Sequence, residues 1–186
     1  MNRPRGRPAL GKGLTREDIL AAALTLLDDG GGQGLTMRAL AARLGVTPMS
    51  LYHHVEDRAA LLRALSDRVY VKVLDRSDAV AEPRQQVRAM LIRYHNAVHR
   101  HPQLTMAIFA TPEAFAGVTR QITERLTELL AEITTKPALW RDILIDHAHG
   151  SGMPPLSTGT DQRQLRTLQE QYRQSVDCLL SCLTRS

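Results

Sequence analysis

The chain has 186 residues, of which 43% are hydrophobic, so it can bury a core as one large domain or two small ones. Its formal net charge of +5 is compatible with an anionic partner. No run approaches the ~18 apolar residues of a membrane-spanning helix, and the basic start leads into a helical pattern instead of a signal peptide's apolar core. We therefore expect a folded, cytoplasmic protein with no membrane partner.

Basic residues are concentrated near the start of the chain. Arg3, Arg5, Arg7, Lys12 and Arg16 all precede the first acidic residue. Residues 1–14 are rich in Gly, Pro and Arg and cannot pack a core, which predicts a disordered basic arm. A second region, from 30 to 55, contains no Asp or Glu at all. Both regions would attract phosphate.

The first helix is expected to begin after Thr15, because Thr15 and Asp18 have the spacing of a capping box. Its apolar residues recur at helical spacing until the glycines at 30–34, where we expect it to stop. Thr36 is the expected cap of a second helix over 37–44, which Gly45 ends. Thr47 and Pro48 then begin a third, short helix.

Two short helices separated by so few residues predict a helix-turn-helix. Leu51 and Val55 give the third helix one narrow apolar edge, so its other side chains point elsewhere and include no carboxylate. In this motif the second helix lies in the DNA major groove, where such a face would touch bases and phosphates.

The remaining pattern is also helical, since no segment alternates like a strand. Asp57 caps an expected helix over 58–74, and further helices are expected over 84–101, 103–110, 113–133, 137–150 and 162–183. The predicted fold class is all-α, with an N-terminal three-helix DNA-binding domain and a C-terminal helical domain.

The segment GLTMRALAARLGVTPMSLYHHVEDRAALLRAL, residues 34–65, resembles the DNA-binding domain of the TetR family of bacterial transcriptional regulators. It is most similar to the tetracycline-repressor branch, whose C-terminal domain commonly finishes on a helix similar to YRQSVDCLLSCL. The resemblance implies a homodimer that releases DNA when a small effector binds. It places a helix-turn-helix domain at 15–56 and an effector-binding and dimerisation domain at 57–186.

The resemblance also assigns candidate contacts to double-stranded operator DNA. These are Thr36, Arg38, Thr47, Pro48, Met49, Ser50, Tyr52, His53, His54 and Arg58, with Arg58 gripping a backbone phosphate. The chemistry fits, because Arg can donate two hydrogen bonds to guanine, Ser can reach a base edge or phosphate, and Met can contact a thymine methyl. The alternative is that Tyr52 closes the small core and the histidines sit in solvent.

The arm contains Arg5-Gly-Arg7-Pro, which resembles the core of hooks that enter the minor groove of A·T-rich DNA. Narrow minor grooves attract arginine, so Arg5 and Arg7 are candidate DNA contacts. The alternative is a solvated basic tail.

The effector is expected to differ from tetracycline. In that branch a histidine before a Thr-Arg-Pro-like turn binds the drug's metal, whereas Ile108 and Phe109 stand in the comparable stretch here. We therefore expect no metal and no other cofactor, and an apolar or aromatic effector. Candidate contacts are Tyr94, Met106, Phe109, Phe115, Trp140 and His147, with core packing as the alternative role.

Other reactive residues carry weaker signals. His95, His99 and His101 could be a zinc site by spacing but have no local acidic or cysteine partner, so exposed or capping roles are expected. Asp146, His147 and Ser151 lack a nucleophile elbow, so we do not expect an enzyme. Cys178 and Cys182 are expected to be buried apolar residues, with redox sensing as the alternative.

The expected function is a ligand-responsive transcriptional repressor whose last two helices form a four-helix bundle with their symmetry mates. The apolar residues expected to build that interface are Leu139, Trp140, Ile143, Leu144, Leu165, Leu168, Tyr172, Val176, Leu179, Leu180 and Leu183. The rival is an architectural DNA-binding dimer without an effector. A sizeable apolar pocket in the C-terminal domain would favour the sensor.

Overall fold

The computed structural model describes residues 14–76, 81–152 and 162–183, and in these ranges the chain forms helices and no strand. The all-α prediction is confirmed. The helices are α1 (Arg16–Gly34), α2 (Met37–Leu44), α3 (Pro48–Tyr52), α4 (Arg58–Tyr70), α5 (Pro83–Arg100), α6 (Pro102–Phe109), α7 (Val118–Ala131), α8 (Pro137–Gly152) and α9 (Gln162–Ser181). Two 3₁₀ helices are η1 (Val71–Leu74) and η2 (Pro112–Ala114).

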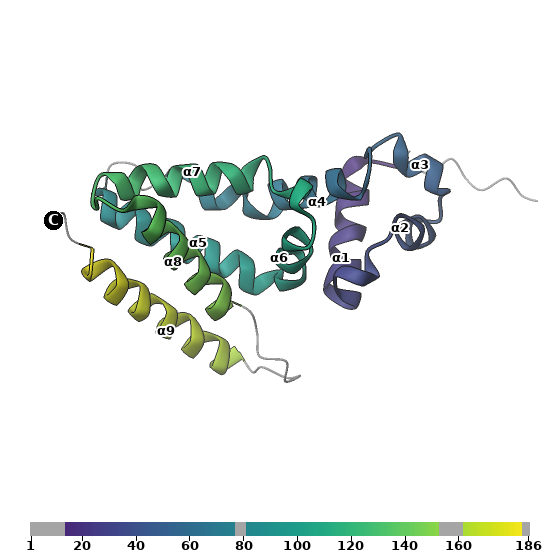
Figure 1. The fold of residues 1–186 in the computed structure, drawn as a ribbon. Coiled ribbons are helices and arrows are strands. Elements are labelled where there is room, and N and C mark those ends of the chain that lie inside the picture. Colours follow the sequence, from purple (N-terminus) through teal and green to yellow (C-terminus); the bar gives the residue numbers. More distant parts are fainter. Residues whose placement is uncertain (1–13, 77–80, 153–161, 184–186) are drawn as a thin grey trace, which may run out of the picture.

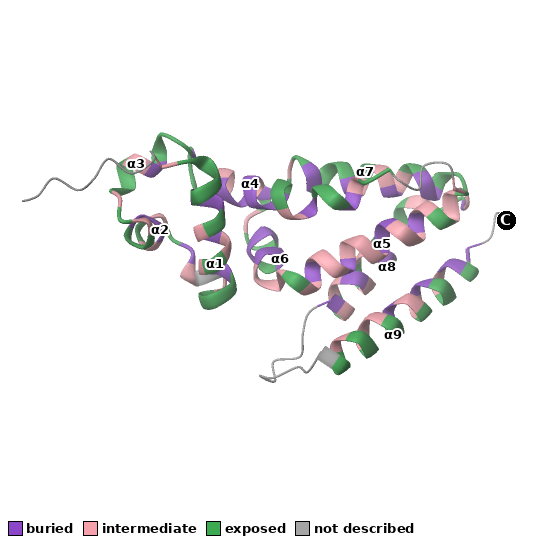
Figure 2. Cartoon of the chain, turned by 180° about the vertical axis from the view of Figure 1, so that it is seen from behind, coloured by how far each residue is buried: buried purple, intermediate pink, exposed green. Residues whose placement is uncertain are grey.

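The helices are arranged in two parts joined by α4 (Figure 1). The first part consists of α1, α2 and α3, and the second contains α5 to α9. Helix α4 starts beside the first part and runs along the second (Figure 2), and it contacts α1 as well as α5, α6 and α7. Helix α1 also packs on α6, so the two parts share a contact surface besides α4.

Four helices begin where the sequence indicates. The Thr15 hydroxyl accepts from the Asp18 amide at 3.1 Å, and the Asp18 carboxylate accepts from the Thr15 amide, which completes the capping box. The hydroxyls of Thr36 and Thr47 and the carboxylate of Asp57 cap α2, α3 and α4 in the same way. Each such cap contributes about 1 kcal/mol to helix stability.

Gly45 closes α2 in a left-handed conformation, with φ 66° and ψ 28°. The amide of Val46 then donates to the carbonyl of Ala41 at 3.0 Å, as expected for a glycine C-cap. This turn lets α3 start only a few residues after α2 ends and fixes the crossing of the helix-turn-helix.

The clearest differences from the expected helix bounds lie at three places, and the other bounds shift by at most two residues. Helix α1 continues to Gly34 across a break at Gly31, whose φ of 66° and ψ of −174° are not helical. The expected helix over 58–74 changes to the 3₁₀ segment η1 after Tyr70. The expected helix over 113–133 begins only at Val118. Gly117, which follows η2, has φ 58°, so its backbone is not helical and the helix cannot continue through it.

Helix α9 is held by its apolar side. Tyr172, Val176, Leu180 and Leu183 are buried against the second part, and the opposite side of the helix is exposed (Figure 2). At its C-terminal end, Arg84 donates to the carbonyls of Leu180 and Leu183. Every helix in the described ranges is too short or too polar to cross a membrane.

Candidate nucleic-acid interface

The helix-turn-helix has one buried side and one exposed side. Leu40 of α2 and Leu51 of α3 are fully buried, and Ala41 and Val55 nearly so. Helix α2 packs on both α1 and α3, and Leu27 of α1 is also fully buried. Because α3 has only five residues, this single edge fixes which way all its other side chains point.

The exposed side carries nearly all of the expected DNA-contacting residues. Met49 is 66% exposed and Tyr52 46% exposed, so Tyr52 does not close the core. The other exposed members are Thr36, Arg38, Thr47, Pro48, His53 and His54, and Ser50 is half-buried. Since no carboxylate occurs between residues 30 and 55, this face offers donors, a cation and a thioether to a polyanion.

Ser50 and Thr47 are linked at the start of α3. The Thr47 hydroxyl accepts from the Ser50 amide at 3.3 Å, and the two hydroxyls share a hydrogen bond at 3.0 Å. The cap therefore also orients the Ser50 hydroxyl. A base or phosphate at this position would meet a preorganised hydroxyl pair.

Arg58 has partners that the resemblance did not indicate. Its Nε donates to the carbonyl of Leu35 at 3.2 Å, and its terminal nitrogen donates to the hydroxyl of Thr111 at 3.1 Å. The side chain therefore joins the α1–α2 connection to the connection after α6. This geometry favours a bridging role over the expected phosphate grip. Arg5 and Arg7 lie outside the described residues.

Helix α4 is tied to the connection between α6 and α7 at two further points. Arg63 donates to the carbonyl of Glu113 at 2.9 Å, and the carboxylate of Asp67 accepts from the amide of Val118 at 2.9 Å. A Cβ on Gly117 would collide with that carboxylate. We call the contacts of Arg58, Arg63 and Asp67 with residues 111–118 the α4 ladder. Sequence reasoning missed it because its partners are 50 or more residues apart.

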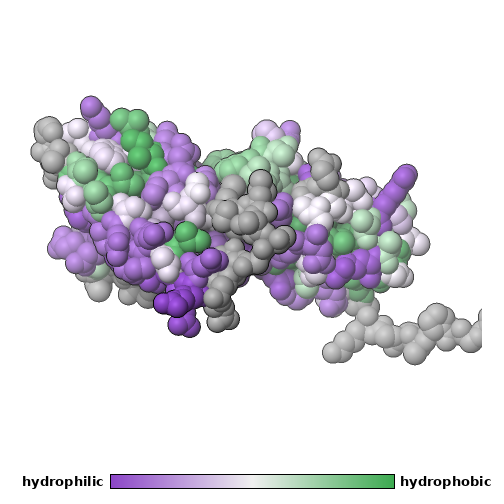
Figure 3. Space-filling model, turned by 90° about the horizontal axis from the view of Figure 1, so that it is seen from below, coloured by the Kyte–Doolittle hydropathy of each residue, from purple (hydrophilic) through white to green (hydrophobic). Residues whose placement is uncertain are grey.

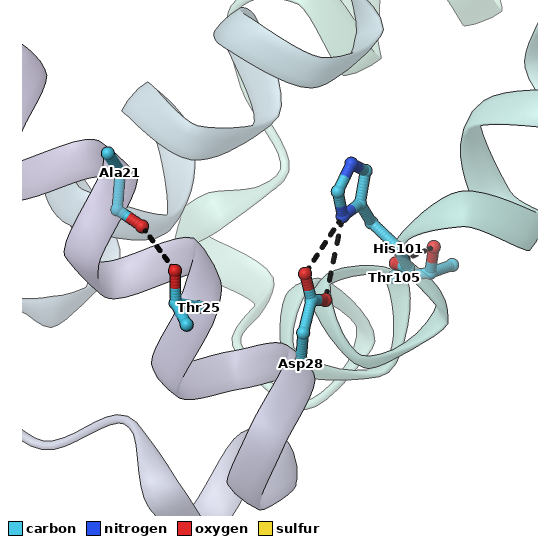
Figure 4. A network of polar contacts seen from close by, with 5 residues as sticks. All are labelled: Ala21, Thr25, Asp28, His101 and Thr105. Atoms are coloured by element: carbon cyan, nitrogen blue, oxygen red, sulfur yellow. Dashed lines mark hydrogen bonds and ion pairs between the residues drawn. The ribbon is translucent and has the colours of Figure 1, made fainter.

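A second polar contact joins the two parts (Figure 4). His101, between α5 and α6, donates from Nδ1 to the carboxylate of Asp28 on α1, at 3.3 Å to Oδ2. The hydroxyl of Thr105 donates to the His101 carbonyl at 3.4 Å and so supports the turn that presents the imidazole. The expected exposed role of His101 thus becomes an inter-part contact.

The six expected effector contacts do not all meet in one place. Tyr94 shares a 2.6 Å hydrogen bond with Nε2 of His149, and the ring of Phe109 stands edge-on to that imidazole at 4.7 Å between centroids. Tyr70 lies 5.7 Å from Tyr94. We call Tyr70, Tyr94, Phe109 and His149 the aromatic cluster. Burial raises the pKa of Tyr70 to about 12, raises that of Tyr94 and lowers that of His149.

The other four candidates lie elsewhere. Met106 and Phe115 are about half exposed, Met106 faces a cleft beside Arg58, and Trp140 packs against the core from the start of α8. His147 faces α9. Sequence reasoning chose His147 and missed His149, two positions further on, because helical spacing alone does not say which side of α8 is inward.

His95 is 1% exposed, so the expectation of an exposed or capping role is wrong for this residue. Its ring stacks on Tyr172 at 3.8 Å between centroids, and its Nε2 has no hydrogen-bond partner among the residues that the structure describes. Burial lowers the pKa of His95, and the neighbouring His99 and His147 lower it further. Across the described ranges, no group of three His, Cys, Asp or Glu side chains could hold a metal ion.

His147 does not form a nucleophile–base pair with Ser151. Its Nε2 bonds to the hydroxyl of Ser175 at 2.7 Å, and that hydroxyl donates its proton to the carbonyl of Tyr172 at 2.9 Å. Nε2 of His147 is therefore the donor, so this nitrogen cannot act as a general base toward Ser175. His147 and Ser151 do line a common groove between α8 and α9.

The two cysteines differ from the expectation of buried residues. Cys178 on α9 and Cys182 just after that helix are both free and exposed. On α8, Leu139 is 54% exposed and Ile143 38% exposed, whereas Leu144 is buried. The apolar residues expected to build an interface thus divide into some that face the chain's own core and some that face outward.

A family model described as bacterial regulatory proteins of the tetR family matches residues 19–65. An uncharacterised HTH-type transcriptional regulator of Mycobacterium tuberculosis is 37% identical over 109 residues, which cover 52% of this chain and 50% of that protein. The class D tetracycline repressor of Escherichia coli is 37% identical over 97 residues, covering 47% and 44%. The match spans about half the length of these curated relatives.

Solved structures extend the likeness over the whole fold. BioQ of Mycobacterium smegmatis superposes with a TM-score of 0.71 at 26% identity, covering 90% of this chain and 97% of that one. BioQ with its natural double-stranded DNA operator gives a TM-score of 0.67 at 27% identity, covering 90% and 96%. The expectation that the chain is not an enzyme is confirmed by this regulatory family and fold. The comparisons thus support a TetR family regulator, which the family model matches over residues 19–65 and the fold of BioQ matches over most of the chain.

Proposed function

We propose that the protein is a homodimeric transcriptional repressor that binds a palindromic operator and is released by a small-molecule effector. The observation that carries the proposal is the exposed, carboxylate-free side of α2 and α3, with Arg38, Met49 and Tyr52 outward over a buried edge of Leu51 and Val55. The DNA-bound form of the similar BioQ supports the same use of the fold.

The dimer would form through α8 and α9. Leu139 and Ile143 are exposed apolar residues on α8, and hydrophobic residues gather in a patch on the C-terminal half of the face seen in Figure 3. Exposed apolar area of this kind favours burial against a partner. A two-fold dimer would present its recognition helices to half-sites about 34–36 Å apart, so the operator should be a palindrome.

The α4 ladder offers a route from an effector to the DNA-binding face. Arg58 joins Thr111 to the carbonyl of Leu35, and Leu35 directly precedes Thr36, the cap of α2. A shift of residues 111–118 would thus be passed to the start of α2 and change the spacing of the recognition helices. The effector would act by favouring the state with the wrong spacing.

Two features of the C-terminal part support an effector over the architectural rival. The aromatic cluster places stacking and hydrogen-bonding groups from α4, α5, α6 and α8 together. A cleft of about 360 Å³ also opens between η1, α5 and α7. Its volume lies at the lower end of the range for small-molecule sites.

Selection from random double-stranded DNA, followed by footprinting, tests the operator proposal. We expect a site with a dyad, and binding that weakens steeply with salt because phosphate contacts release counterions. Deleting residues 1–12 should lower affinity mainly for sites with A·T-rich flanks. Binding that is insensitive to salt, or a footprint without a dyad, would contradict the proposal.

Effector release is tested separately with labelled operator complexes. An inducer must bind the free protein more tightly than the DNA-bound protein, by the same factor by which it weakens DNA binding. It should act without added magnesium and in the presence of a chelator. Failure of every compound in a broad panel would favour the architectural dimer.

A further inference from the structure

The cleft between η1, α5 and α7 is unlike the apolar pocket that the sequence indicates. Its base includes Met90 and Leu129, which are buried, and charged side chains of both signs line it. Its charged lining includes Arg93, Glu124, Arg125 and Glu128. None of the six effector contacts expected from the sequence lines this cleft. It is therefore a separate candidate site.

Arg93 connects the cleft to the end of η1. Its Nε donates to the carbonyl of Val73 at 3.2 Å, and a terminal nitrogen donates to the carbonyl of Asp75 at 3.0 Å. These carbonyls lie at the end of the helical stretch that begins with α4, where intrahelical donors run out. A carboxylate is a stronger acceptor for a guanidinium than a neutral carbonyl is. A ligand carboxylate in the cleft would therefore draw Arg93 away from η1.

The opposite side of the cleft is supplied by α7. Glu124 and Glu128 are four residues apart and so share one face of the helix. Arg125 donates to Glu128 at 3.1 Å and to the side-chain oxygen of Gln86 at 3.1 Å. Glu124 takes part in no ion pair within the described parts of the chain. An ammonium group near Glu124 and Glu128 would be attracted to both carboxylates.

We propose that this cleft binds a small zwitterionic molecule and that binding loosens η1. The ligand's carboxylate would pair with Arg93, its ammonium group with Glu124 and Glu128, and a short apolar body would cover Met90 and Leu129. A ligand with one charge would engage only one side of the cleft, so the cleft should favour the zwitterion. The volume of about 360 Å³ restricts the ligand to a small molecule.

The proposal rests on the proposed function only in taking this ligand as the effector. Binding and the loosening of η1 are properties of the protein without DNA, so they can be measured first. If the protein binds the zwitterion but no operator, the proposed function is refuted and the cleft site stands. If it binds the operator but no zwitterion, the cleft site is refuted and the proposed function stands.

Calorimetry on the full chain with three matched probes tests the binding. The probes are 4-(aminomethyl)benzoate, 4-methylbenzoate and 4-methylbenzylamine, which share a ring and differ in charge. We expect the zwitterion to bind at least tenfold more tightly than either singly charged compound. Arg93→Gln and Glu124→Gln should each remove most of that preference. Arg120→Gln, an exposed change on α7 outside the cleft lining, is the control and should leave it unchanged.

Because Arg93→Gln also removes contacts within the fold, Glu124→Gln is the decisive variant. Equal binding of all three probes, or a preference that survives Glu124→Gln, would overturn the site. Hydrogen exchange of the amides of residues 71–76 tests the loosening of η1. We expect faster exchange with the zwitterion bound, and unchanged exchange at saturation would overturn that part of the proposal.

Discussion

The two parts of the molecule place their polar groups in opposite ways. In the first part the interior is aliphatic, and the hydrogen-bonding residues of α2 and α3 lie on the surface. In the second part polar rings lie inside. Tyr70 bonds to the buried hydroxyl of Thr105 at 2.7 Å, and Tyr172 covers His95 and donates to the carbonyl of Leu91 at 3.3 Å.

This difference suits the two proposed tasks, DNA recognition by the first part and the response to an effector by the second. A surface of polar groups over an aliphatic core can exchange partners without disturbing its own fold, as contact with DNA requires. Polar groups packed inside the second part couple any change of charge or contact to the packing itself. We therefore expect the pH dependence of the unfolding free energy to arise from groups on α5, α8 and α9 and not from the DNA-binding face.

The largest expected effect separates the buried edge of α3 from its exposed side. Leu51→Ala should lower the free energy of unfolding by about 2–5 kcal/mol, because the side chain is fully buried. Met49→Ala, two residues earlier and 66% exposed, should change stability by less than about 0.5 kcal/mol while lowering operator affinity. Chemical denaturation and DNA titration measure the two quantities. Similar losses of stability would contradict the assignment of the two sides.

The next effect tests the α4 ladder. Gly117→Ala should destabilise the protein by about 1–3 kcal/mol, since φ is 58° and the new Cβ would collide with Asp67. Gly150→Ala is the matched control, because Gly150 is exposed in α8 with no atom near its Cβ position. That change should stabilise by about 0.5–1 kcal/mol through helix propensity. Thermal unfolding of both variants decides the point, and a neutral Gly117→Ala would remove the argument for a tight ladder.

Arg58→Ala tests whether this side chain bridges the two parts of the molecule. If Arg58 bridges Leu35 and Thr111, its removal should lower stability by about 1–2 kcal/mol and weaken DNA binding through α2. Arg38→Ala, which is exposed, should leave stability within about 0.5 kcal/mol. If Arg58→Ala instead left stability unchanged and lowered the salt dependence of DNA binding by the amount of one phosphate contact, the phosphate role that the resemblance implies would be supported.

Acidification should destabilise the second part. The pKa of His95 is lowered by burial, so the unfolded chain takes up a proton near pH 6.5 that the folded chain does not. Stability contributed by the neutral ring is thus fully present above pH 6.5 and is lost as the pH falls below it. One histidine can add at most about 1.4 kcal/mol per pH unit to this slope.

His95→Asn should flatten the pH dependence of the unfolding free energy between pH 6.5 and 5. An identical slope in wild-type and His95→Asn protein would show that the buried imidazole is not the source.

The smallest expected effect concerns the pair between the two parts. Asp28→Asn should lower stability by about 0–1 kcal/mol, because the carboxylate is 38% exposed and salt screens such pairs. Thermal unfolding in low and high salt measures it. A loss of several kcal/mol would mean that the two parts depend on this contact far more than its exposure suggests.

The sequence predicts the first part better than the second for a physical reason. The caps Thr15, Thr36, Thr47 and Asp57 each act on the amide three residues further on, so their signals are local. The contacts of Arg58 with Thr111 and of Tyr94 with His149 join residues more than 50 positions apart. Spacing along one helix cannot indicate them, and it also cannot show that the Asp67 carboxylate lies where a Cβ on residue 117 would stand.

The exposed side of α2 and α3 is the surface that we propose to read the DNA sequence. The direct measurement is the affinity of wild type, Arg38→Ala and Ser50→Ala for every single-base variant of the selected operator. We predict that each substitution relaxes the preference at particular base pairs by about 1–3 kcal/mol and leaves the other positions unchanged. A uniform loss of affinity across all variants, with every base preference retained, would contradict the claim.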